Sequence, residues 1–151
     1  MDRGPEDVTC KEVDHGSDHY WQAVELRRQV LRLPLGLDYT PEQLESESDS
    51  RHLVAVDSDS SVIGYLMLDP PDAGIIKMRQ VAVSPDLQGR GIGRKLVSLS
   101  EEIARQTASQ EMVLHAREVA LQFYERLGYE AEGEPFEEVG LRHWRMRKSL
   151  A

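Results

Sequence analysis

Residues 81–96, VAVSPDLQGRGIGRKL, combine an apolar strand, a proline turn, a glycine-rich loop and the beginning of a helix. The loop glycines Gly89, Gly91 and Gly93 permit backbone conformations that other residues avoid, and they let a ligand approach the chain closely. The first amides of a helix have no intrahelical partner, and the helix dipole adds positive partial charge at the same end. The segment therefore predicts an anion-binding loop suited to phosphate.

Two common phosphate-binding patterns do not fit this loop. A Walker A loop ends in Lys followed by Ser or Thr, whereas Lys95 is followed by Leu96. A dinucleotide-binding loop needs Gly-x-Gly-x-x-Gly, and its third glycine would fall on Arg94. A glycine-rich turn without a ligand remains the structural alternative, because glycines alone are weak evidence of a site.

Apolar periodicity and turn signals on both sides of the loop predict the order β-α-α-β-β-β-α-β-α-β-β. The predicted strands are residues 8–13, 51–57, 62–68, 75–83, 112–116, 129–132 and 141–147. The predicted helices are residues 20–33 with Asp18 as N-cap, a short helix from Pro41 with Thr40 as N-cap, residues 91–107, and residues 119–127 before Gly128. Antiparallel strands followed by a β-α-β crossover predict an α/β fold with a mixed, mostly antiparallel central sheet flanked by helices.

The bulk composition is that of one globular domain. The chain has 151 residues, of which 40% are hydrophobic and 30% charged, so we expect a single domain over residues 1–151 with a loose N-terminus at residues 1–7. No apolar run approaches the roughly 18 residues that span a bilayer, and the N-terminus is unlike a signal peptide. These features predict a cytoplasmic protein without a membrane partner. The net charge of −9 argues against a nucleic-acid partner and is compatible with a cationic substrate.

The cysteine and the scattered histidines disfavour nucleophilic and metal chemistry. Cys10 is the only cysteine, which excludes an internal disulfide and a Cys-based metal site. Because no base is positioned beside it, we expect Cys10 to be a small strand residue rather than a nucleophile. His15, His19 and His52 have no metal-ligand spacing, so we predict no metal.

Two segments together resemble a known superfamily. The pattern VAVxPxxQGRGIG at residues 81–93, opening a helix, resembles motif A of the GNAT superfamily of acyl-CoA-dependent N-acyltransferases. Residues 114–130, LHAREVALQFYERLGYE, are similar to the A-x-x-F-Y-x-x-x-G-F/Y segment of the same superfamily. The order of elements over residues 8–149 also resembles the GNAT fold. Residues 136–143, FEEVGLRH, further resemble the ElaA-like branch.

The resemblance implies acetyl-CoA as co-substrate. In GNAT proteins the backbone of the central strand binds the pantetheine arm, a role that falls here on Val81, Ala82 and Val83, although a plain core strand is the alternative. The resemblance places the pyrophosphate on the amides of Gln88, Gly89, Arg90, Gly91, Ile92 and Gly93. An amide of the same strand, that of Val81, is expected to stabilise the oxyanion.

The resemblance assigns an acid and leaves the base open. Tyr124 occupies the position that in many GNAT proteins protonates the departing thiolate; a phenol can do so because its pKa of about 10 exceeds the roughly 8.5 of a thiol. Helical spacing also permits a purely apolar role, in a stripe formed by Val119, Ala120, Phe123, Tyr124 and Leu127. Many relatives carry a Glu on the central strand, but residues 77–80, KMRQ, have no carboxylate, so an ordered water is the default base.

His143 is our second candidate catalytic residue. We expect His143 and one acid of the pair Glu137 and Glu138 to face the acceptor amine; an ordinary strand histidine with solvated acidic neighbours is the alternative. The predicted substrate-binding residues are Gln80, His115 and Glu138. A satisfied structural histidine is the alternative for His115.

The sequence therefore predicts an N-acetyltransferase that moves an acetyl group from acetyl-CoA to a primary amine by direct attack. The acceptor is expected to be a small-molecule or peptide amine in a pocket built by an early helical segment, residues 33–47, and a late loop, residues 133–143. An acidic rim there would suit a polyamine, an amino sugar or a peptide N-terminus equally well. A non-catalytic acyl-CoA-binding sensor of the same fold is the main alternative, and a nucleotide hydrolase is a second one that the missing Lys-Ser/Thr pair disfavours. The sequence leaves the oligomeric state open; GNAT proteins are often dimers, so the resemblance allows a homodimer.

Overall fold

The computed structural model describes residues 7–151, so that all but Asp7 of the predicted loose N-terminus lies outside the described residues. Seven strands form one sheet in the order β1-β2-β3-β4-β5-β7-β6. The strands are β1 (Thr9–Val13), β2 (Arg51–Val56), β3 (Val62–Leu68), β4 (Ile75–Val83), β5 (Glu111–Arg117), β6 (Glu130–Glu138) and β7 (Leu141–Ser149). The α-helices are α1 (Asp18–Arg27), α2 (Pro41–Glu45), α3 (Ile92–Gln106) and α4 (Leu121–Arg126). The predicted order of elements and the mixed α/β class are confirmed.

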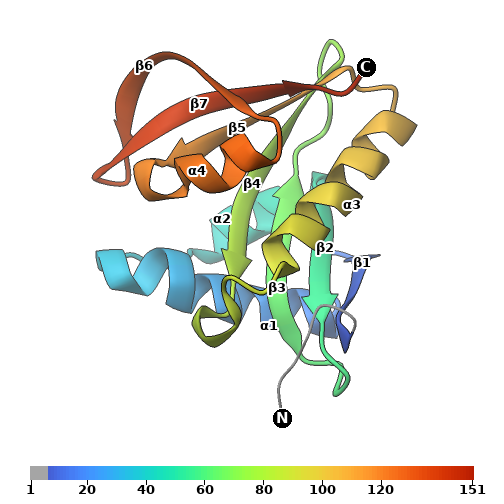
Figure 1. The fold of residues 1–151 in the computed structure, drawn as a ribbon. Helices are drawn as coiled ribbons and strands as arrows, with labels where there is room; N and C mark the ends of the chain where they lie inside the picture. Colours follow the sequence, from blue (N-terminus) through green and yellow to red (C-terminus); the bar gives the residue numbers. More distant parts are fainter. Residues whose placement is uncertain (1–6) are drawn as a thin grey trace.

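The sheet divides between β4 and β5, which form its one parallel pair. These strands pair only from Ile75 to Lys77 and from Glu111 to Val113, and beyond that point they diverge. In Figure 1 the strands β5, β6 and β7 lean away from β1–β4, and α4 lies beside the divergence. The remaining neighbours in the sheet are antiparallel. The divergence leaves part of β4 without a strand on one side.

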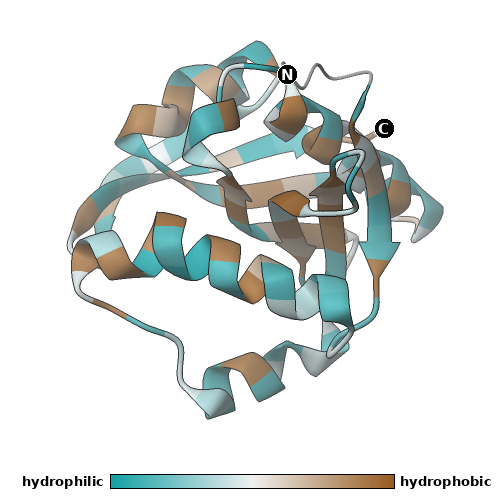
Figure 2. Cartoon of the chain, turned by 90° about the horizontal axis from the view of Figure 1, so that it is seen from below, coloured by the Kyte–Doolittle hydropathy of each residue, from teal (hydrophilic) through white to brown (hydrophobic). Residues whose placement is uncertain are grey.

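Helices cover the two faces of the sheet with different cores. The larger core packs α3 and α4 on the face that carries Leu66, Ile76 and Met112. The smaller core packs Ala23 of α1 on the face that carries Val54, Tyr65 and Met67. Figure 2 shows the strands between these helices largely in the hydrophobic colour. No helix within residues 7–151 is long and apolar enough to cross a membrane.

The first helix differs from its predicted bounds at both ends. Its N-cap is Ser17, whose hydroxyl accepts a hydrogen bond from the amide of Tyr20, so the predicted cap Asp18 is instead the first helical residue. After Arg27 the chain continues as a π-turn, Arg28–Arg32, in which the Leu33 amide donates to the carbonyl of Arg28 five residues back. A 3₁₀ turn containing Pro34 then ends the helical segment, because proline has no amide hydrogen to continue it. The short α2 has the predicted Thr40 cap, completed by Gln43.

Two predictions for the C-terminal third were wrong. Residues 133–138, expected as a loop, belong to β6, because a bulge between Glu132 and Phe136 accommodates Gly133 and Pro135 within the strand. Val119, expected in a buried stripe, is 91% exposed, because Glu118–Ala120 form a 3₁₀ turn rather than a turn of α-helix. Gly128, with φ of 95°, follows α4 as predicted.

Candidate active site

A cavity of about 330 Å³ opens where β4 and β5 diverge. The lining side chains come from both sheet halves and both faces: Leu31, Arg32, Leu35, residues 77–81 of β4, residues 114–117 of β5, Ala120, Tyr124, Glu138, Val139 and His143. The structure therefore brings together six of the predicted site residues, namely Gln80, Val81, His115, Tyr124, Glu138 and His143. Ala82, Val83 and residues 88–93 lie outside this lining, along the continuation of β4.

The backbone of β4 presents unpaired polar groups beside the cavity. The Ser84 amide donates to the Ile63 carbonyl of β3 at 2.9 Å, and Ala82 lies opposite Tyr65 of the same strand. Every second residue of an antiparallel strand directs its amide and carbonyl to the same neighbour, so those of Ala82, like the Ser84 amide, point toward β3. In trans peptides the Val81 carbonyl and the Val83 amide must then point the other way, into the gap. The Val83 carbonyl faces the same side and accepts from Gln88 Nε2 at 3.1 Å.

Gln80 forms a bulge at the point where the cavity begins. The β3–β4 register shifts between Tyr65 and Met67, and Gln80 has φ of 60°, a left-handed conformation that costs about 1–3 kcal/mol for a residue other than glycine. Its side-chain carbonyl accepts a hydrogen bond from the Tyr39 hydroxyl at 2.5 Å. The bulge holds the Gln80 side chain on the cavity wall, as the sequence predicted, through a backbone conformation that the sequence did not indicate.

The glycine-rich loop has the geometry of an anion site. Gly89 and Gly91 have φ of 80° and 83°, and Gly91 is the N-cap of α3 without a side-chain cap. The amides of Gly91, Ile92 and Gly93 donate no hydrogen bond to any residue in the described range 7–151. Gly93 is helical and serves packing, because a Cβ there would lie 3.1 Å from Cζ of Phe123. Two of the three glycines therefore shape the loop and the third brings α3 close to α4.

Tyr124 reaches the cavity from the face that carries α3 and α4. Its side chain is 6% exposed and packs edge-on against Phe123 and Tyr129. Within residues 7–151 its hydroxyl has no hydrogen-bond partner, although the residue lines the cavity. Burial raises the pKa of Tyr124 well above its ordinary value, so the phenol stays protonated at neutral pH and can donate a hydrogen bond into the cavity.

On the opposite face, Glu138 lies between two histidines. The His143 Nδ1 lies 2.9 Å from the Leu141 carbonyl, and since a carbonyl only accepts, Nδ1 carries the hydrogen. The His143 Nε2 then faces Glu138 at 3.7 Å, and the other carboxylate oxygen accepts from His115 Nδ1 at 3.1 Å. Desolvation opposes ionisation of Glu138, but the His115 hydrogen bond and the nearby charges of His115, His143 and Lys77 together lower its pKa. An amine placed between Nε2 and the carboxylate would find two acceptors.

The lining of the cavity is mainly cationic, in contrast to the acidic rim that the sequence allowed. Arg32, Lys77, Arg79 and Arg117 line it, with Glu138 as the one carboxylate among its lining residues. The whole chain has 18 Lys and Arg against 27 Asp and Glu, so the local charge has the opposite sign to the net charge. A net charge summed over the sequence does not report the few side chains that turn inward at one place.

Cys10 lies on β1, far along the sheet from β5. Its side chain is half-buried, and burial raises the pKa of the thiol despite the nearby charge of Lys95. A raised pKa disfavours the thiolate that a nucleophile requires. Within residues 7–151 no three His, Cys, Asp or Glu side chains form a group that could hold a metal ion.

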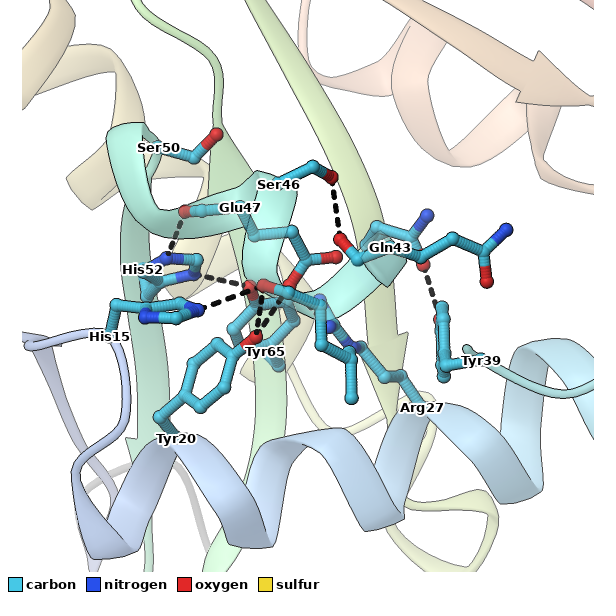
Figure 3. Close-up of polar contacts among 12 residues, drawn as sticks. His15, Tyr20, Arg27, Tyr39, Gln43, Ser46, Glu47, Ser50, His52 and Tyr65 are labelled. Carbon is cyan, nitrogen blue, oxygen red and sulfur yellow. Dashed lines mark hydrogen bonds and ion pairs between the residues drawn. The ribbon is translucent and has the colours of Figure 1, made fainter. Parts of the chain in front are cut away.

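A second polar cluster, which the sequence did not reveal, lies between α1 and the 3₁₀ turn Ser46–Asp49 that follows α2 (Figure 3). We call it the buried network, and its members are Tyr20, Arg27, Glu47, His52 and Tyr65. Arg27, 0% exposed, donates to Glu47 Oε1 at 2.5 Å and to the Tyr65 hydroxyl at 3.0 Å. The Tyr65 hydroxyl donates in turn to His52 Nδ1 (2.6 Å), because His52 Nε2 donates to the Glu47 carbonyl (3.0 Å).

The Tyr39 ring connects the buried network to two lining residues of the cavity, Arg32 and Gln80. The Arg27 guanidinium lies over the ring of Tyr39 at 4.8 Å, and the Arg32 guanidinium lies 4.9 Å from the same ring centroid. Tyr39 also makes the hydrogen bond to Gln80. No sequence motif marks these residues, because they are distant in the chain and meet only after the sheet and α1 have formed.

Comparisons with known proteins agree with this architecture. The family model described as an acetyltransferase (GNAT) domain matches residues 37–150. A UPF0039 protein of Schizosaccharomyces pombe is 29% identical over 112 residues, which cover 73% of this chain and 75% of that protein.

Crystal structures with the same fold cover nearly the whole chain. An acyl-CoA N-acyltransferase from Pseudomonas aeruginosa is 25% identical with a TM-score of 0.76, covering 94% of this chain and 98% of that one. ElaA of Escherichia coli is 21% identical with a TM-score of 0.79, covering 93% and 99%. An aminoglycoside 6′-N-acetyltransferase complexed with coenzyme A is 16% identical with a TM-score of 0.78, covering 95% and 97%. The chain therefore belongs to the GNAT acetyltransferase family.

Proposed function

We propose that the protein transfers an acetyl group from acetyl-CoA directly to a primary amine. The observation that carries the proposal is the placement of Tyr124 and the His143–Glu138 pair on opposite sides of one cavity. One side offers a protonated phenol for a leaving group, and the other offers two acceptors for an amine. A direct transfer needs those two functions at once and needs no enzyme nucleophile.

The donor would lie along β4 and the N-terminus of α3. The Val81 carbonyl and the Val83 amide provide an acceptor and a donor two residues apart, which is the spacing that an extended amide-containing chain such as pantetheine can pair with. The amides of Gly91, Ile92 and Gly93 would bind the pyrophosphate, with Gln88, Gly89 and Arg90 completing the loop. The related aminoglycoside acetyltransferase with coenzyme A supports this choice of donor.

The acceptor would enter from the face that carries His143. His143 Nε2 would take the proton from the attacking amine, while the Leu141 carbonyl fixes the tautomer and Glu138 stabilises the imidazolium that forms. The amine nitrogen forms a bond to the thioester carbon, and a central-strand amide, that of Val81, would stabilise the oxyanion. The carbon–sulfur bond then breaks, and Tyr124 donates its proton to the departing thiolate.

A Tyr124→Phe variant tests the transfer. Thiol release from acetyl-CoA in the presence of an amine panel is expected to fall about a hundredfold in kcat, because phenylalanine keeps the packing and removes the proton donor. Stabilisation by acetyl-CoA in a thermal-shift assay is expected to be unchanged. A wild-type protein that is stabilised by acetyl-CoA but acetylates no amine would favour the sensor alternative, which the absence of a carboxylate at residues 77–80 supports.

A further inference from the structure

Three of the four cationic side chains that line the cavity form no ion pair within residues 7–151. Arg79 is exposed and pairs with Asp69 at 3.2 Å, but within residues 7–151 Arg32, Lys77 and Arg117 form no ion pair. Each of these three side chains is half-buried on the cavity wall. Positive charges that are partly removed from water and left unpaired raise the free energy of the empty site, and a bound anion would lower it.

These cations lie on the acceptor face of the sheet. Arg117 pairs in register with His143, and directly opposed residues share a face of an antiparallel ladder. Lys77 pairs with Val113, which is four residues from Arg117 and therefore on the same face. Arg32 comes from the segment that follows α1. The glycine-rich loop and Tyr124 belong to the α3–α4 face, so these cations are separated by the sheet from the proposed pyrophosphate site.

Arg32 is held in place for a ligand. The π-turn directs its side chain to the cavity, and its guanidinium stacks over the Tyr39 ring, which Arg27 contacts from the buried network. The Arg32 Nε is enclosed and has no hydrogen-bond partner in the described part of the chain. The Arg32 side chain as a whole is only half-buried, so its guanidinium charge stays within reach of an oxyanion in the cavity.

We infer, on the basis of the proposed function, that the acceptor amine also carries an oxyanion group, a carboxylate or a phosphate. Arg32, Lys77 and Arg117 would bind this group, and Glu138 with His143 would hold the amine. The division of charge selects for a molecule with both signs: one carboxylate is available for the ammonium and three unpaired cations for the anion. Diamines and polyamines, which carry positive charge alone, would be repelled by the same walls.

A matched acceptor panel tests the inference. Straight-chain ω-amino acids of three to six carbons, n-alkylamines and diamines of the same lengths, and aminoalkyl phosphates are compared by thiol release from acetyl-CoA. We expect kcat/KM for the best anionic amine to exceed that of its neutral counterpart about tenfold to a hundredfold, with diamines lowest. The amino acid and phosphate arms identify the oxyanion. Equal or better turnover of diamines would overturn the inference while leaving the transfer reaction intact.

Variants of two cavity cations distinguish a role in binding the acceptor from a role in binding acetyl-CoA. Arg32→Gln and Lys77→Met are expected to raise KM for the anionic amine about tenfold, with KM for acetyl-CoA unchanged. Arg28→Gln is the control, because Arg28 belongs to the same π-turn but pairs at the surface with Glu25 and Asp38. A rise in KM for acetyl-CoA alone would show that these cations serve the donor and would overturn the inference.

A binding experiment covers the case in which no panel amine is acetylated. Butyrate and butylammonium are titrated into the CoA-bound protein and followed by NMR of the Arg side chains. We expect butyrate to bind and Arg32→Gln to abolish its binding, whereas binding of butylammonium alone would contradict the inference. Failure of CoA itself to bind would instead refute the proposed function.

Discussion

The buried network and the cavity use the same kinds of side chain for different ends. Each combines arginine with glutamate and histidine, and Tyr39 lies between the two. In the buried network Glu47 is paired with Arg27, and His52 uses both ring nitrogens. In the cavity His143 Nε2 and the Tyr124 hydroxyl have acceptor or donor capacity left over, and Arg32, Lys77 and Arg117 form no ion pair within the described residues 7–151.

The difference between them shows how a structural polar cluster is distinguished from a reactive one. Residue type does not separate the two, since a buried Arg–Glu–His set would pass for a catalytic group in a list of residues. Access to the remaining hydrogen-bonding capacity does separate them: Arg27 Nε also has no partner within residues 7–151, but Arg27 is 0% exposed and no ligand can reach it, whereas the groups of the cavity can meet a ligand. Four substitutions test this comparison.

Replacing His143 should have the largest effect, and only on turnover. His143→Ala is expected to lower kcat for amine acetylation about a hundredfold to ten-thousandfold, which is the usual contribution of a general base. Steady-state kinetics over a range of pH is the measurement, with the melting temperature as control. Full activity in the variant would place the base elsewhere.

Removing Glu47 from the buried network should lower the free energy of unfolding rather than the rate of turnover. Glu47→Ala leaves the Arg27 charge buried without its partner, so the free energy of unfolding is expected to fall by about 3–5 kcal/mol. Urea unfolding at low temperature measures the loss. The double variant Arg27→Met with Glu47→Leu is the matched control, and it should recover most of the stability because no uncompensated charge remains. A small loss in Glu47→Ala would mean that the network is open to water.

Acid should weaken the buried network through His52. Burial is the largest effect on its pKa and lowers it; the Glu47 carbonyl and charge oppose this change, and the charges of His15 and Arg27 reinforce it. The folded pKa lies below the unfolded value of 6.5, so the unfolded chain binds the proton first. The free energy of unfolding should therefore fall as pH drops through 6.5 and level off below the folded pKa.

Denaturant titrations at several pH values would measure the acid effect. His52→Gln should flatten the dependence, and His19→Gln, at the surface beside Ser60, should leave it as in the wild type. An unchanged slope in His52→Gln would assign the acid sensitivity to other groups.

The substitution of Tyr39, which connects the buried network to the cavity, should have the smallest effect of the four. Tyr39→Phe removes the hydrogen bond to Gln80 and keeps the ring between the two guanidinium groups. We expect KM for the acceptor to rise about threefold, the value of one neutral hydrogen bond, with KM for acetyl-CoA and the unfolding midpoint unchanged. An effect as large as that of His143→Ala would show that the network participates in catalysis.

The parts of the site that are continuous in sequence could be predicted. The glycine loop and its helix follow from local spacing, because a helix N-terminus is a property of neighbouring residues, whereas Tyr124 is indicated by the resemblance of residues 114–130 to the GNAT segment. Glu138 could have been preferred to Glu137 by strand alternation, had Gly133 and Pro135 not resembled a break in the strand.

The remaining features depend on tertiary structure. A left-handed Gln80 has no sequence signature, since glutamine is not a residue that favours positive φ. The direction of Arg32 depends on a π-turn that apolar periodicity does not reveal. The cationic cavity wall is a minority of charges in an acidic chain, gathered from separate segments by the divergence of β4 and β5.

The π-turn at Arg28–Arg32 has a consequence for how such an enzyme diversifies. A π-turn holds one residue more than the α-helical turn it replaces. Deleting a single codon there would rotate the following side chains by about 100° around the helix axis and would carry Arg32 off the cavity wall. The glycine loop and the sheet would be untouched by that deletion. Acceptor preference in this architecture can therefore change by a single-residue insertion or deletion in one turn, while the machinery for the donor is inherited intact.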